Sequence, residues 1–129
     1  MQKIFGIIAS FYGFSAVALG AFGAHALKTK LDEYHHAIYE KAVSYQFYHV
    51  AALLAVVFLS TKIETKSLNY AGWFFTAGTL FFSGSLYLLA TTDLLGLQSL
   101  KNILGPITPL GGLCFLIGWV LLIISFSKL

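Results

Sequence analysis

Residues 4–24 read IFGIIASFYGFSAVALGAFGA, an apolar run without a single charged side chain. A helix crosses a bilayer core about 30 Å thick with roughly 20 apolar residues, because each residue adds about 1.5 Å. The run is therefore long enough to span a membrane. It also exceeds the roughly 7–15 apolar residues of a signal peptide, so we expect a span that the mature protein retains.

The rest of the chain repeats this pattern. Further apolar segments cover residues 42–59, 70–90 and 107–126, and the stretches between them are too short for a soluble domain. These segments lack the polar face that helices of a soluble bundle show. The sequence predicts an all-α fold, a four-helix transmembrane bundle that forms one integral membrane domain over residues 1–129.

The composition excludes several other classes of protein. Hydrophobic residues make up 58% of the 129 and charged residues 10%, whereas a soluble domain carries about 25% charged residues. A disordered chain, a coiled coil and an ordinary soluble enzyme are thereby excluded. The net charge of +3 comes from lysines that stand singly beside the apolar runs. Such lysines flank membrane spans, so we expect no nucleic-acid partner.

The lysines do not determine the orientation in the membrane. They divide equally between the two sides, Lys3, Lys62, Lys66 and Lys128 on one and Lys28, Lys30, Lys41 and Lys101 on the other. The positive-inside rule therefore gives no result.

The segment between the first two spans has its own pattern. Residues 28–41 read KTKLDEYHHAIYEK, with apolar positions at helical spacing on one side and acidic positions on the other. This pattern predicts a short amphipathic interfacial helix over residues 30–41, opened by Thr29 or Lys30 and running into the second span. Before the fourth span, Pro109 fits the first helical turn, where a missing N–H costs little.

Small residues form a stripe along the first span. They recur at steps of three and four, at Gly6, Ala9, Gly13, Ala16, Gly20 and Gly23. Spans associate in lipid by close contact, which small residues permit. We therefore expect another span to pack along this stripe.

Polar residues within the spans suggest a candidate site. His49 lies about 10 Å deep in the second span, and counting back from Thr91 places Ser83 about 12 Å deep in the third, on the same side. We therefore expect one layer to hold both residues, together with Tyr45, Gln46 and Tyr87. His25 ends the first span on that side. The layer is open to two interpretations, hydrogen bonding between helices or a ligand or proton site.

Other chemistries find little support. Glu33 and His36 have the spacing of a di-iron motif, but there is no second such motif, and the spans hold no carboxylate except at their ends. A haem held by His25 and His49 would need ligands about 10 Å apart in depth. His49 has no buried acid to orient it as in a hydrolase, and the first span lacks the acid of small multidrug exporters. We expect no metal and no cofactor.

Several strings resemble one family of small bacterial membrane proteins. They occur in this order: GAFGAHAL (20–27), YEKAVSYQFYH (39–49), AGWFF (71–75), FFSGSLYLL (81–89), LGPITPLGG (104–112) and IGW (117–119). Together they resemble domain-of-unknown-function family 423, also called uncharacterised protein family 0382. The resemblance implies a four-span, multi-pass protein of the cell membrane, and it implies no reaction.

Two functional hypotheses follow. The first is a non-enzymatic structural or interaction module that works with the lipid bilayer or membrane partners. The second is a small-molecule or proton-linked transporter or binder that uses the polar layer around His49. Four spans rarely enclose a channel, so transport would require a homo-oligomer. The sequence identifies no small-molecule ligand.

Overall fold

The computed structural model describes residues 2–129, and the regular structure in that range is all helical. α1 spans Gln2–His25, α2 Glu33–Ser60, α3 Lys66–Leu95 and α4 Lys101–Ser127. A short 3-10 helix, η1, covers Gln98–Leu100 before α4. Each α-helix is long and apolar enough to cross a membrane, which confirms the predicted all-α architecture with four spans.

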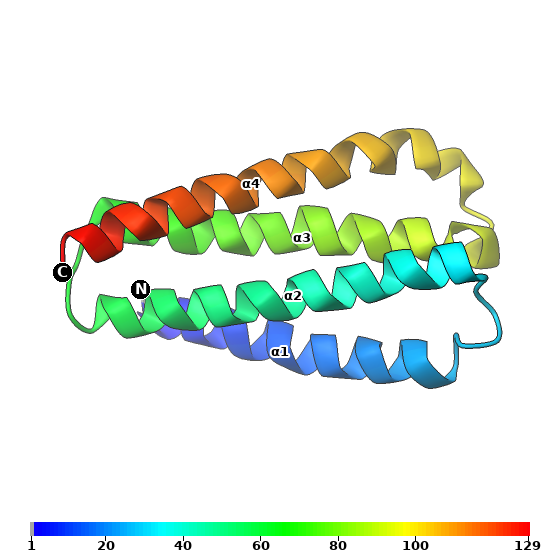
Figure 1. Cartoon of the computed structure of the whole chain (residues 1–129), viewed down its shortest axis with the longest axis horizontal. Helices are drawn as coiled ribbons and strands as arrows, with labels where there is room; N and C mark the ends of the chain where they lie inside the picture. Colours follow the sequence, from blue (N-terminus) through cyan, green and yellow to red (C-terminus); the bar gives the residue numbers. More distant parts are fainter. Residues whose placement is uncertain (1) are drawn as a thin grey trace.

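Successive helices run in opposite directions, as Figure 1 shows. Both chain ends and the α2–α3 loop lie at one end of the bundle, and the other two loops lie at the opposite end. Helices that are neighbours in sequence pack on one another: α1 on α2, α2 on α3 and α3 on α4. The α2–α3 pair is therefore central, with α1 and α4 on its two outer sides (Figure 1).

Local sequence signals fix the helix ends. Asp32 accepts a hydrogen bond from the backbone N–H of His35, and the side chain of Thr65 does the same for Leu68. Such N-caps satisfy donors that a helix leaves unpaired at its start. α3 ends at Gly96, whose φ of 68° lies in the left-handed region that glycine adopts without steric cost.

The structure does not support the short interfacial helix predicted over residues 30–41 as an element of its own, although the predicted continuation into the second span is present. α2 begins after Asp32, not at Thr29 or Lys30, and runs without a break from Glu33 to Ser60. No glycine or proline interrupts this segment, so its backbone hydrogen bonds continue into the span. At about 1.5 Å per residue, α2 is about 10 Å longer than the hydrocarbon core is thick. Its charged first turns therefore extend beyond the apolar span as part of one continuous helix.

α4 also begins earlier than its apolar run. It starts at Lys101, so Pro106 and Pro109 lie inside the helix, and the placement of Pro109 in the first turn is wrong. Each proline lacks an N–H, which leaves the carbonyls of Asn102 and Gly105 without their usual partner. The short η1 leads directly into Lys101, several residues before the apolar run.

Helix contacts rely on glycine. A Cβ at Gly111 would lie 2.8 Å from the Cα of Phe82 and still closer to its nitrogen, so the backbones of α3 and α4 touch there. On α1, a Cβ at Gly20 would lie 3.4 Å from Val43, and one at Gly23 would overlap the ring of Tyr39. Most of the small-residue stripe thus lies against α2, with Ala9 and Ala16 buried. Gly6 faces open space.

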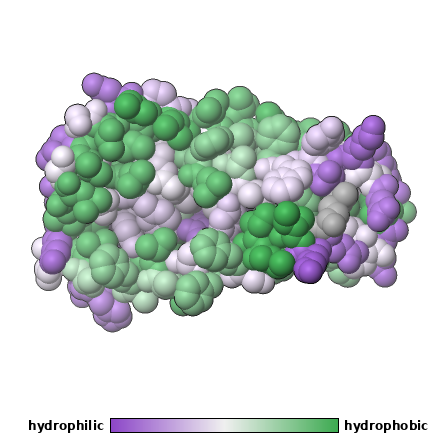
Figure 2. All heavy atoms as spheres, turned by 180° about the vertical axis from the view of Figure 1, so that it is seen from behind, coloured by the Kyte–Doolittle hydropathy of each residue, from purple (hydrophilic) through white to green (hydrophobic). Residues whose placement is uncertain are grey.

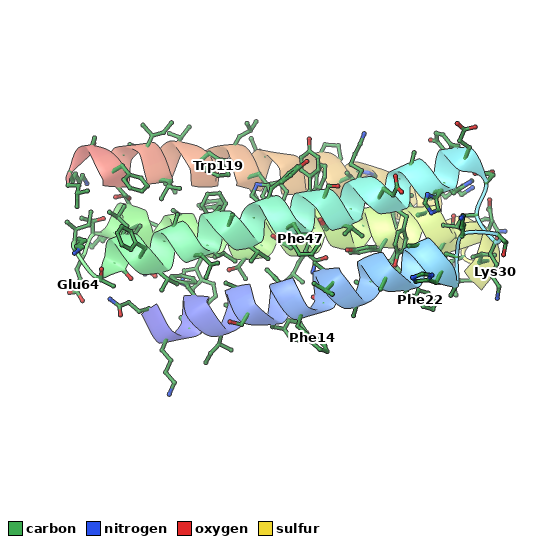
Figure 3. All side chains as sticks on the ribbon, turned by 60° about the horizontal axis from the view of Figure 1, so that its bottom comes forward. Phe14, Phe22, Lys30, Phe47, Glu64 and Trp119 are labelled. Carbon is green, nitrogen blue, oxygen red and sulfur yellow. The ribbon has the colours of Figure 1, made fainter. Side chains whose placement is uncertain are left out.

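The outer surface is mostly apolar along the helices and polar at the ends. Figure 2 shows a broad hydrophobic band between hydrophilic ends. Phe14 and Phe22 project outward from α1, with 73% and 53% of their surface exposed, whereas Lys30 and Glu64 mark the two ends (Figure 3). This distribution fits lipid around the middle of the bundle and water at its ends.

Candidate functional site

Buried polar side chains near the middle of the bundle form two clusters, both between α2 and α3, and each also involves one outer helix. Gln46 turns toward α1 and α3, whereas His49 turns toward α3 and α4. Gln46 and His49 lie three positions apart and are each 4% exposed. α2 therefore contributes the central residue of both clusters.

The first cluster joins three helices through Gln46. Its side-chain nitrogen donates to the carbonyl of Tyr12 and to the hydroxyl of Ser15, both at 2.8 Å. Its oxygen accepts the phenol hydrogen of Tyr87 at 2.7 Å. The carbonyl of Tyr12 can only accept, which fixes the orientation of the amide. Ser83 donates separately to the carbonyl of Ala42, at 2.8 Å.

This cluster borders a cavity of about 170 Å³. The cavity opens between α1 and α3, and it is lined by Phe11, Tyr12, Ser15, Gln46, Thr79, Leu80, Ser83, Gly84 and Tyr87. We call it the Gln46 pocket. Such a pocket within the apolar band would be reached from lipid rather than from water.

The second cluster holds His49 in one tautomer. Nδ1 lies 2.7 Å from the carbonyl of Tyr45, which can only accept, so Nδ1 carries the hydrogen. The indole N–H of Trp119 donates to Nε2 across 3.1 Å, so Nε2 has no hydrogen. Both ring nitrogens are thus bonded inside the protein, and the imidazole is neutral.

Aromatic rings enclose His49. Its ring stacks on Phe115 with 3.5 Å between centroids and 5° between planes, and Phe75 lies 5.7 Å away. Trp119 of α4, labelled in Figure 3, completes the enclosure. Its ring centroid lies 5.8 Å from that of His49. These contacts add packing to the hydrogen bonds and leave His49 little room for a ligand.

The structure brings together only part of the predicted layer. Gln46 and Tyr87 are hydrogen-bonded, and Ser83 lines the same pocket. His49 lies outside it, because Ser83 bonds to Ala42, about two turns from His49 along α2. The shared layer of His49 and Ser83 is therefore wrong. The depth count assumed helices that end with the apolar runs, whereas α2 and α3 extend beyond them by unequal amounts.

The remaining candidates lie apart from the pocket. Tyr45 contributes its carbonyl to His49, while its ring lies 4.7 Å from that of Phe82. His25 is exposed at the end of α1. Sequence reasoning missed Trp119 as the partner of His49. The only signal was an indole donor within an apolar helix, where a buried N–H usually finds an acceptor.

A charged cluster joins three helices at the end that carries the α1–α2 and α3–α4 loops. His35 lies between the carboxylates of Asp32, at 2.7 Å, and Asp93, at 3.5 Å, and Lys101 lies 3.4 Å from Asp93. Hydrogen bonds from the backbone N–H of His35, and then from its ring, lower the pKa of Asp32. These exposed contacts link the starts of α2 and α4 to the end of α3.

The chain is similar to a family of bacterial membrane proteins. The family described as "Protein of unknown function (DUF423)" matches residues 19–112. A UPF0382 membrane protein of Staphylococcus aureus (strain bovine RF122 / ET3-1) is 43% identical over 127 residues, which cover 98% of each chain. The UPF0382 membrane protein YwdK of Bacillus subtilis (strain 168) is 39% identical over 128 residues, again 98% of each. No solved structure matches the chain.

Proposed function

The chain belongs to the DUF423 family of membrane proteins, and from this premise we propose that it is a non-enzymatic structural or interaction module of the cell membrane. The observation that carries the proposal is the state of His49. A catalytic or proton-carrying group needs a free atom or a change of protonation. Both nitrogens of His49 are bonded to groups of the bundle itself.

The sequence of the spans supports the same proposal. His49 is the only histidine within the four apolar segments, and none of these segments contains Asp, Glu, Lys or Arg. The segments are residues 4–24, 42–59, 70–90 and 107–126. Proton relays and ion pathways in membranes use such groups. A transporter built around His49 would therefore have to break the bonds to Tyr45 and Trp119 before the imidazole could act.

The exposed surface of the bundle supports lipid as the partner of the module. The lipid-facing sides of α1 and α4 expose large apolar side chains, among them Phe14 at 73% and Ile123 at 67%. The extended start of α2 presents charged residues at the adjoining membrane surface. The chain would thus act as a rigid body that contacts acyl chains along its length and polar groups at its ends.

The protonation and hydrogen bonding of His49 test the proposal. We would record nitrogen NMR spectra of the protein with labelled histidine, in lipid at pH 7, for wild type and for Trp119→Phe. Wild type should show His49 as a neutral ring with hydrogen on Nδ1, and Trp119→Phe should shift Nε2 alone. An imidazolium signal, or proton flux into liposomes that His49→Phe abolishes, would refute the proposal.

A further inference from the structure

We propose that the Gln46 pocket binds a small neutral molecule that has an apolar body and one hydrogen-bond donor, taken up from the bilayer between α1 and α3. This inference goes beyond the structural role above, because it assigns a ligand class to a site that the role does not require. It rests on the hydrogen bonds around the pocket, its size and the absence of a side chain at Gly84.

The polar side chains that line the pocket already donate their polar hydrogens in hydrogen bonds within the protein. The amide of Gln46 donates both of its hydrogens, and Tyr87 donates its phenol hydrogen to Gln46. The hydroxyls donate to backbone carbonyls: Ser15 to Phe11, Thr79 to Phe75, Ser83 to Ala42 and Tyr12 to Thr76. These lining side chains therefore have no donor left for a guest.

Their acceptor capacity is not used up. The phenol oxygen of Tyr87 and the hydroxyl oxygen of Ser83 each keep lone pairs, and the oxygen of Gln46 keeps one beside the bond from Tyr87. A guest can therefore gain a hydrogen bond here only by donating one. A ketone, an ether or an ester, which can only accept, would gain no hydrogen bond from these side chains.

The guest must also be uncharged. No carboxylate lines the pocket, and a cation in apolar surroundings is costly without a paired negative charge. An alcohol or a phenol meets both conditions, because the hydroxyl can donate while the body lies against Phe11 and Leu80.

The size of the pocket sets the scale of the guest. Its volume is about 170 Å³, and a cavity of about 150 Å³ in another protein holds benzene. A single six-membered ring with a hydroxyl therefore fits. Gly84 keeps this space open, because a Cβ there would meet no atom within 4 Å. A larger side chain at position 84 can therefore occupy the pocket without displacing the helices.

Three matched fluorinated probes test the proposal by fluorine NMR on the purified protein in detergent. The first, 4-fluorophenol, can donate a hydrogen bond. The second, 4-fluoroanisole, can only accept one, and fluorobenzene can do neither. Gly84→Leu fills the pocket. Gly6→Leu is the matched control, because position 6 also faces open space and lies outside the pocket.

We expect saturable binding of 4-fluorophenol, about tenfold tighter than that of either other probe, which is the effect of roughly one hydrogen bond. Gly84→Leu should abolish it and Gly6→Leu should preserve it, with both variants folded by circular dichroism. Equal binding of the three probes, binding that survives Gly84→Leu, or no saturable binding in wild type would overturn the proposal. The last result would leave water or an acyl chain as the occupant.

Discussion

Trp119 donates its indole N–H to Nε2 of His49 across 3.1 Å, although the two residues lie seventy positions apart. The bond joins α4 to α2, which are not neighbours in sequence. Together with the bond from Nδ1 to the carbonyl of Tyr45, it determines which nitrogen of His49 carries the hydrogen. The contact therefore helps to fix both a helix position and the state of the only histidine within the apolar spans.

Replacing Trp119 by Phe should destabilise the bundle, because Nε2 of His49 is then buried without a donor. We expect a loss of about 1 kcal/mol in the free energy of unfolding. A double-mutant cycle with His49→Phe, measured by unfolding in mixed micelles, checks the pairing. The free energy of unfolding should fall by less in the double variant than the sum of the decreases in the two single variants. Additive losses would show that the bond contributes nothing.

Replacement by alanine should have different effects on stability at two adjacent glycines, Gly111 and Gly112. Gly111→Ala places a methyl group against the backbone of Phe82, which cannot move aside, so we expect a loss of about 1–3 kcal/mol. At Gly112 the nearest atom to a Cβ is 3.9 Å away. Gly112→Ala should therefore leave stability unchanged or raise it slightly, because alanine favours a helix. Equal effects in unfolding measurements would contradict the close approach of α3 and α4.

Gly23→Ala should separate the end of α1 from α2, because the new methyl group would overlap the ring of Tyr39. That ring cannot turn away freely, since its hydroxyl donates to the carbonyl of Leu19. We expect a lower thermal midpoint. Leucine at position 39 removes the ring that the methyl group would overlap. Gly23→Ala should therefore lower the thermal midpoint less in the Tyr39→Leu background than in wild type. Gly6→Ala is the control, and a similar loss there would point to a general intolerance of α1.

Acidification should weaken the start of α2 through Asp32. Its pKa is lowered in the folded protein, so its contribution is complete above the unfolded pKa of about 4 and disappears as the pH falls through the lower folded value. Asp32→Asn keeps a capping oxygen and removes the titration. The thermal midpoints of wild type and Asp32→Asn should run parallel above about pH 5 and converge below it. If the difference between the two thermal midpoints stayed constant down to pH 2, the titration of Asp32 would not contribute to stability.

The predictability of the site differed from residue to residue. Gln46 and Tyr87 are polar residues in apolar runs, and such residues must find partners inside a bundle, so their pairing could be anticipated. The separation of His49 from Ser83 could not. It depends on how far α2 and α3 extend beyond their apolar residues, which hydropathy does not report. Asp32 carried the local signal of a cap, but the acidic residues near it fitted several starts for the helix.

The sequence by itself determined that the chain forms four membrane-spanning helices. An apolar run of about 20 residues has no other stable form in lipid, where every backbone group must be bonded within its own segment. Only the tertiary structure decided which polar groups meet, because partners such as His49 and Trp119 come from different helices. Their meeting depends on the rotation and depth of each helix. Contacts of a few ångströms, such as that between Gly111 and Phe82, set both of these, and they are made between segments far apart in the chain.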